Sequence, residues 1–392
     1  MAGYGAELMV ETARLWASLA EPHASIPGRY SLRGVVGPDE FHTAYPGQDR
    51  PGLDNDAYTN IMAAWTLLHS ADLLDRLAGQ HRDAVVAKVD LAPDEAQHWR
   101  YLAERLHLAR DEAGLFLPFE HYESLEPFDM EAHERDHPDE RLDWFIPAQG
   151  RDINGLQVQK QASFAMLVHL LTPRATKSLL ARMGYEVTDE IIRATIRADL
   201  ERTSHDSSLS NLIYAGALAK LDPSRSWEIY ADALHPDEKE GHSQTEKGVH
   251  LGAMAATLDI LQRIHLGLQP GLDALSIDPA PHPGAKRINV RALYRANALN
   301  VDLSGARLTI TADRNNPASV PLDVCGHEAV LSTEYSTDFA IEALLMDLDG
   351  TLTHTDPIHL RAIQALLNQE GLSIDEEGFR RHVSGRSNLE IG

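Results

Sequence analysis

Residues 56–77, DAYTNIMAAWTLLHSADLLDRL, decide the fold class of this chain. The apolar residues of this stretch recur every three or four positions, at Ile61, Met62, Trp65, Leu68, Leu73, Leu74 and Leu77. This spacing places apolar side chains along one face of an α-helix, which must then pack against other helices. The same period runs through residues 96–109, 161–171, 189–200 and 248–266. We therefore expect residues 7–265 to be mainly helical.

Long polar connections separate these helical stretches. They cover residues 29–55, 120–157 and 235–247. Connections of this length inside a compact helical domain often carry function. Helices joined alternately by short and long loops predict an arrangement around a central pocket, in a first domain over residues 1–268.

The hydrophobic period changes after Pro270. Apolar and polar residues alternate over 299–303 and again over 308–312, and Ser304 with Gly305 supplies a turn between them. Alternation around a turn predicts a β-hairpin. We expect a small antiparallel β domain over residues 269–335, ending in a polar linker at 332–338.

The last block has a third pattern. A short apolar strand at 343–346 runs into Asp347-Leu-Asp-Gly-Thr351, and a helix is expected near 357–370. A strand that ends in acidic residues and passes into a helix is typical of the first βα unit of a doubly wound α/β domain. The chain stops about 45 residues after this motif, whereas a typical domain has about 100–150 residues. We therefore expect the segment 336–392 to be an incomplete α/β domain.

Composition excludes several classes of function. The chain has 35 Lys and Arg against 59 Asp and Glu, a net charge of −24. Such an acid excess argues against a nucleic-acid partner or an anionic membrane, because phosphate contacts need clustered Lys and Arg.

The N-terminus lacks a basic signal-peptide region, and the longest apolar stretch, 164–171, is too short to span a bilayer. The single cysteine, Cys325, excludes an internal disulfide and a Cys-based zinc site. We expect a cytoplasmic protein.

The first candidate for chemistry is the Gly37-Pro-Asp-Glu40 turn in the loop before residues 56–77. Such a turn can present a carboxylate at the rim of a pocket, where burial favours a general acid. The alternative is a surface turn followed by an N-capped helix, since Asp and Asn before a helix, as in Asp54-Asn-Asp56, are ordinary caps.

Several segments together resemble glycoside hydrolase family 65. They are VGPDEF (36–41), DNDAYTNIMAAW (54–65), KQA (160–162), TSHDSSLS (203–210) and GVHLGAMA (248–255), in the family's order. The family comprises inverting phosphorylases of α-linked glucose disaccharides such as maltose, trehalose, kojibiose and nigerose, and a few hydrolases. The resemblance implies a disaccharide substrate and inorganic phosphate as co-substrate. Family members often form homodimers, and the oligomeric state of this chain stays open.

The resemblance implies roles residue by residue. Glu40 matches the proton donor, and Lys160 with Gln161 matches the pair that contacts the sugar. The residues in segments that shape the phosphate pocket are Ser207, Ser208 and His250. Lys247 stands where relatives commonly carry Glu, and the loop 141–157 differs from the family.

Chemistry agrees with phosphorolysis but leaves alternatives. Glycosidic cleavage needs an acid on the leaving oxygen, and inverting hydrolysis also needs a second carboxylate to activate water. Phosphate is already an anionic nucleophile, which hydroxyls, a histidine and a lysine can hold. Glu246 is the nearest candidate for a hydrolytic base, so an inverting α-glucoside hydrolase is one alternative, and a non-catalytic remnant is another. Lys160 could instead extend to the surface, residues 203–210 could be a capped helix start, and His250 could be a core histidine. We expect no metal in the helical domain.

The C-terminal motif resembles the first motif of the haloacid dehalogenase superfamily. The resemblance implies that Asp347 attacks phosphorus, that Asp349 is the general acid/base, and that Mg2+ binds beside Asp347 and Asp349. Residues 353–359 resemble the β-phosphoglucomutase branch, with Arg386 as a cap residue that contacts phosphate. The superfamily's later motifs are absent, so we expect this segment to be inactive alone.

The two resemblances together imply one architecture. Family 65 enzymes have an N-terminal β-sandwich, an (α/α)6 barrel and a small β domain. Here Glu40 lies only 40 residues into the chain. We expect a mainly α protein: a partial (α/α)6 barrel, a small antiparallel β domain and an incomplete α/β segment. Inverting phosphorolysis yields β-glucose 1-phosphate, which a β-phosphoglucomutase converts to glucose 6-phosphate, so the two activities would share one intermediate.

Overall fold

The chain forms two compact units, residues 1–337 and 338–392. The computed structural model describes residues 4–339 except 49, 78, 138–139, 205–208, 235–249, 272 and 283, together with residue 364. The expected α/β segment, with Asp347, Asp349 and Arg386, therefore lies outside the described residues. Within the part that is described, no helix has the length and apolar character needed to cross a membrane.

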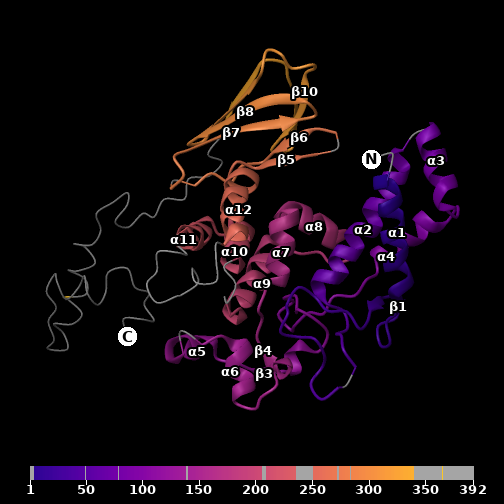
Figure 1. Ribbon diagram of the computed structural model, residues 1–392, viewed down its shortest axis with the longest axis vertical. Helices are drawn as coiled ribbons and strands as arrows, with labels where there is room; N and C mark the ends of the chain where they lie inside the picture. Colours follow the sequence, from indigo (N-terminus) through magenta and orange to yellow (C-terminus); the bar gives the residue numbers. More distant parts are fainter. Residues whose placement is uncertain are drawn as a thin grey trace. The chain divides into compact units, whose positions relative to one another are not determined.

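The first unit is mostly helical, as the sequence predicts (Figure 1). Its helices are α1 (Tyr4–Leu19), α2 (Ala57–Arg76), α3 (Gly79–Val89), α4 (Glu95–Ala103), α5 (Met130–Asp136), α6 (Leu142–Ala148), α7 (Ser163–Leu171), α8 (Pro173–Arg182), α9 (Asp189–Arg202), α10 (Ser210–Leu218), α11 (Pro223–Ala233) and α12 (Leu251–Asp259). Short helical turns are η1 (Tyr122–Ser124), η2 (Ile153–Gly155) and the π-helix η4 (Ile260–His265).

Helix α2 is the centre of the helical part. The Asp56 side chain caps it by accepting a hydrogen bond from the Thr59 backbone N–H at 2.7 Å. Its buried side chains, which include Ile61, Leu68 and Leu74, pack against α1, α4 and α7. These side chains belong to a hydrophobic core that runs from α1 to η4. Each fully buried Leu or Ile contributes roughly 1.5–3 kcal/mol to stability, so this core supplies most of the driving force for folding.

The helices differ from the predicted ones in three places. The stretch 96–109 is helical only to Ala103, because the backbone of residues 105 and 107 pairs with Tyr30 on another segment. The connection 120–157 contains α5 and α6, so the expectation of a plain polar loop was wrong there. The helix expected at 248–266 begins at Leu251 in the described residues and changes to the π-helix η4.

The β strands near the N-terminus and in the middle of the chain are short. They are β1 (Ala20–Pro22), β2 (Tyr30–Leu32), β3 (Glu126–Pro127) and β4 (Leu156–Gln157). Strands β1 and β2 pair antiparallel, and β3 pairs with β4 in parallel. The second pairing joins the segment after η1 to the segment that leads into residues 159–161.

The remaining strands form two four-stranded sheets. They are β5 (Leu268–Pro270), β6 (Leu275–Ile277), β7 (Arg287–Tyr294), β8 (Asn297–Ser304), β9 (Arg307–Ala312), β10 (Val320–Val324), β11 (His327–Leu331) and β12 (Glu334–Asp338), in the orders β11-β10-β6-β5 and β12-β9-β8-β7. The predicted hairpin is confirmed: β8 and β9 pair antiparallel, with Leu303 opposite Leu308. Two expectations were wrong, since β6 and β10 pair in parallel and β12 occupies the expected linker. Both depend on partners that are distant in sequence.

Candidate active site

The Gly37-Pro-Asp-Glu40 turn lies between β2 and α2 and approaches the start of α2 closely. A Cβ atom at Gly37 would lie 2.2 Å from Oδ2 of Asp56, so only glycine fits there. Asp56 itself is buried, and burial raises its pKa to about 6. The capped helix start that the sequence offered is confirmed, with Asp56 as the cap, and the turn packs directly on this cap.

Asp39 is the buried residue of the turn, and its hydrogen bonds hold the turn in place. It is 5% exposed, and its carboxylate accepts a hydrogen bond from the backbone N–H of Lys160 at 2.6 Å. The other carboxylate oxygen lies 2.6 Å from Nδ1 of His42, whose Nε2 lies 2.9 Å from the carbonyl oxygen of Leu156. The buried ring of His42 thus connects the Asp39 side chain to the backbone of Leu156. The turn is thus fastened to the 156–160 segment at two points.

Glu40 points outward next to Lys160. Its side chain is 62% exposed, and Oε2 lies 2.5 Å from Nζ of Lys160, whose side chain is 19% exposed. The structure therefore brings together two of the residues that the sequence singled out. The half-buried Gln161 follows Lys160 directly in the chain. Lys160 does not extend freely into solvent, contrary to the alternative reading of this residue.

The structure places the predicted phosphate residues only in part. Ser207 and Ser208 lie outside the described residues, as does Glu246. His250 is the N-cap residue of α12 and is half-buried. Helix α10 begins at Ser210, so the described part of the 203–210 segment connects α9 to α10.

Two buried polar residues beside this site were missed by the sequence reading. Asp199 is 2% exposed and accepts a hydrogen bond from Nε2 of Gln159 at 2.8 Å. Burial is the largest cause that raises the pKa of Asp199, to about 7. One signal was available in the sequence, because Asp199 continues the apolar face of Ile192 and Ile196 on a predicted helix. An acid at a core position of an amphipathic helix is rarely accidental.

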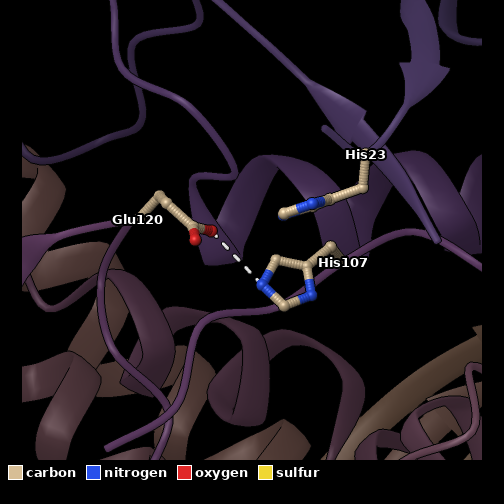
Figure 2. Close-up of side chains that lie close together, drawn as sticks. All are labelled: His23, His107 and Glu120. Carbon is tan, nitrogen blue, oxygen red and sulfur yellow. Dashed lines mark ion pairs between the residues drawn. The ribbon is translucent and has the colours of Figure 1, made fainter. Parts of the chain in front are cut away.

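A second cluster joins His23, His107 and Glu120, which come from three separate segments (Figure 2). Nε2 of His107 lies 3.2 Å from Oε2 of Glu120, and the two imidazole rings meet edge to face with centroids 4.6 Å apart. The hydrogen bond from His107 is the largest cause that lowers the pKa of Glu120, to about 2. Such a His2Glu set has the chemistry of a zinc site.

The tautomer of His23 decides against a metal in this arrangement. Its Nδ1 accepts hydrogen bonds from the backbone N–H groups of Ser25 and Ile26 at 3.2 and 3.1 Å. The ring proton of neutral His23 is therefore on Nε2, and that nitrogen has no lone pair to offer a cation. The cluster is a set of polar contacts that joins three segments: the residue after β1, the segment after α4 and the segment that contains Glu120.

The chain is similar to known proteins over most of its length. An uncharacterized glycosyl hydrolase of Mycobacterium tuberculosis is 36% identical over 326 residues, which cover 82% of this chain and 24% of the relative. A trehalose 6-phosphate phosphorylase of Lactococcus lactis is 28% identical over 335 residues, covering 84% of this chain and 42% of the relative. A solved structure described as a putative kojibiose phosphorylase from human microbiome shares the fold, with a TM-score of 0.66 at 19% identity, and covers 88% of this chain and 47% of that one.

This chain thus spans less than half the length of each of these relatives. The glycosyl hydrolase family 65 central catalytic domain matches residues 1–259, which hold Glu40, Lys160 and Asp199. The chain therefore belongs to glycosyl hydrolase family 65.

Proposed function

We propose that the protein carries out inverting phosphorolysis of an α-linked glucose disaccharide, giving β-glucose 1-phosphate and the second sugar. The observation that carries the proposal is the contact of Glu40 with Lys160 inside a family 65 catalytic domain. Relatives named as phosphorylases of trehalose 6-phosphate, kojibiose, trehalose and glucosylglycerol support it further.

In this proposal Glu40 is the general acid. It protonates the glycosidic oxygen as the bond to C1 breaks, while phosphate forms a bond to C1 from the opposite face. In the absence of substrate, Oε2 of Glu40 contacts Nζ of Lys160. A sugar hydroxyl that binds Lys160 and Gln161 takes the place of Glu40 at Nζ, which frees the Glu40 side chain to reach the glycosidic oxygen. The exposure of the Glu40 side chain allows that proton to come from solvent.

The phosphate co-substrate needs donors on the face of C1 opposite to Glu40. We assign this role to Ser207, Ser208 and His250, because the family resemblance places them in the phosphate segments. Hydroxyl and imidazole donors suit a phosphate anion, since charge-assisted hydrogen bonds are about twice as strong as neutral ones. We also propose that the chain divides into three parts, with boundaries at residues 268 and 335, and that the protein forms a homodimer.

The C-terminal motif extends the proposal to a second activity. Asp347-Leu-Asp349-Gly-Thr, with its resemblance to β-phosphoglucomutases, supports a Mg2+-dependent conversion of β-glucose 1-phosphate in the natural protein. The motif lies outside the described residues, and its sequence alone supports this step. Asp347 and Asp349 would hold the Mg2+.

The test uses the natural protein that contains this chain. It is offered maltose, trehalose, trehalose 6-phosphate, kojibiose and nigerose, each with and without phosphate, and the anomer of the product is followed by NMR. We expect β-glucose 1-phosphate to form only when phosphate is present. Glucose release without phosphate would instead show the hydrolase, with Glu246 as the first base to test, and no turnover of any sugar would indicate a non-catalytic protein.

A further inference from the structure

Asp199 lies near the end of α9, beneath the segment that carries Lys160 and Gln161. The side-chain amide of Gln159, which precedes Lys160 in that segment, donates a hydrogen bond to its carboxylate at 2.8 Å, and the backbone N–H of Phe164 lowers its pKa. A buried carboxyl group therefore holds the residue directly before the proposed sugar-binding pair, Lys160 and Gln161.

The backbone of Gln159 links the same carboxyl group to the start of the 203–210 segment. Its N–H donates to the carbonyl oxygen of Arg202 at 2.7 Å, and its carbonyl oxygen accepts from the N–H of Ser204 at 2.8 Å. The Thr203 hydroxyl donates to the backbone carbonyl of Asp199 at 2.8 Å. Helices α7, α9 and α10 lie side by side here (Figure 1). Displacement of Gln159 would therefore disturb the proposed sugar-binding pair and the backbone at residues 202–204 together.

We propose that Asp199 is a positioning residue for the phosphorolysis proposed above, on which this inference rests. Its carboxylate fixes Gln159, so that the next two residues, Lys160 and Gln161, are in place to meet the sugar. Asp199 touches neither substrate and acts through the residues that it holds. The partial positive charge at the N-terminus of α7 also favours a carboxylate at this point.

The charged and titratable groups around Asp199 come from four elements. Arg202 lies on α9 itself, Asp39 on the turn with Glu40, Tyr122 on η1 and Tyr214 on α10. Arg202 lowers the pKa of Asp199, whereas burial and Asp39 raise it, with burial the largest cause. Burial keeps both tyrosines neutral by raising their pKa well above 10. Asp199 itself has a pKa of about 7.

A buried carboxyl that gains charge near neutral pH is costly to the fold, which argues for a functional reason to have an acid here. Protonation removes the negative charge and leaves the carboxyl group a weaker acceptor, because the hydrogen bond from Gln159 is then no longer charge-assisted. The hold on Gln159 then weakens. Activity should therefore rise as pH increases through about 7.

The test compares Asp199→Asn with wild type and with Asp189→Asn, an exposed acid on the same helix. It measures kcat/KM for the disaccharide and for phosphate across about pH 5 to 9, the range in which general acids and bases are read from such profiles. Loss of a charge-assisted hydrogen bond predicts a drop of roughly 10- to 100-fold for both substrates. We also expect the rise near pH 7 to disappear in Asp199→Asn and to persist in Asp189→Asn.

Gln159→Met gives a second test that keeps the acid and removes the amide donor. It should lower both kcat/KM values, while circular dichroism verifies that each variant is folded. A pH profile that keeps its rise in Asp199→Asn, with unchanged constants, would overturn the positioning role alone. A wild-type protein that makes no β-glucose 1-phosphate would overturn the proposed function, and the positioning role with it.

Discussion

Nζ of Lys160 lies 2.5 Å from Oε2 of Glu40, although 120 residues separate the two in the chain. The contact is possible because Asp39, next to Glu40, accepts the backbone N–H of Lys160 at 2.6 Å. A buried hydrogen bond thus sets the position of an exposed ion pair. The proposed acid and the proposed sugar ligand are held in register before any substrate arrives.

Lys160→Met should weaken disaccharide binding and leave the fold intact. The variant loses a charged donor to a sugar hydroxyl, so KM for the disaccharide should rise roughly 10- to 100-fold. The melting temperature should change little, because an exposed ion pair contributes about 0–1 kcal/mol. Steady-state kinetics and thermal melts check both. Lys177→Met, which removes an exposed pair with Asp189, is the matched control and should keep KM.

Glu40→Gln should slow phosphorolysis of the disaccharide by roughly 10²- to 10⁴-fold, the contribution of a positioned general acid. A glucosyl fluoride should be affected far less, because fluoride leaves without a proton. The ratio of the two rates separates an acid role from a loss of binding. Normal turnover of the disaccharide by Glu40→Gln would rule out Glu40 as the acid. Glu190→Gln, an exposed acid on α9, serves as the control.

Gly37→Ala should destabilise the protein by about 1–3 kcal/mol, the usual cost of overpacking a tight contact. The new Cβ would lie 2.2 Å from Oδ2 of the buried Asp56, which caps α2. Chemical denaturation measures the change. Gly155→Ala is the control, because the nearest atom to a Cβ there is 4.0 Å away. Equal stability of both variants would show that the turn can move away from α2.

Glu120→Gln should destabilise the protein at neutral pH and not in strong acid. The folded pKa of Glu120, about 2, lies below its unfolded value of about 4.3. Its ionised form therefore adds stability that is complete above the unfolded pKa and is lost as pH falls through about 2. Thermal melts of Glu120→Gln and of the exposed control Glu123→Gln over a pH series measure this difference. A melting temperature that rises with added Zn2+ would show instead that His23 has turned to bind metal.

Asp199→Asn should make stability less sensitive to pH. The folded pKa of Asp199, about 7, lies above the unfolded value of about 3.9, so the folded state binds the extra proton between these values. Wild-type stability from this group therefore falls as pH rises from about 4 to about 7 and then stays level. The melting temperature of Asp199→Asn relative to wild type should be higher at pH 8 than at pH 5. A constant difference would mean that Asp199 does not bind its proton in this range.

The local signals in the sequence were sufficient to predict the helical fold and to single out Glu40 as the proposed acid. The period of residues 56–77 predicts α2, whose bounds differ by one residue at each end. Alternation around Ser304 and Gly305 predicts the β8–β9 hairpin. Glu40 and Lys160 were found through motifs whose residues are contiguous in the chain. Each of these signals depends on neighbours within a few residues, which is why a single sequence carries them.

Only the tertiary structure showed what depends on contacts between distant segments. The early end of α4, the parallel pairing of β6 with β10 and the burial of Asp199 each require a partner more than 40 residues away or packing from several elements. Charge and hydrogen bonding at such positions depend on desolvation, and desolvation depends on which segments cover a group. The sequence by itself indicated the family, the helices and Glu40 as the proposed acid, whereas the packing of distant segments determined how Glu40 is held.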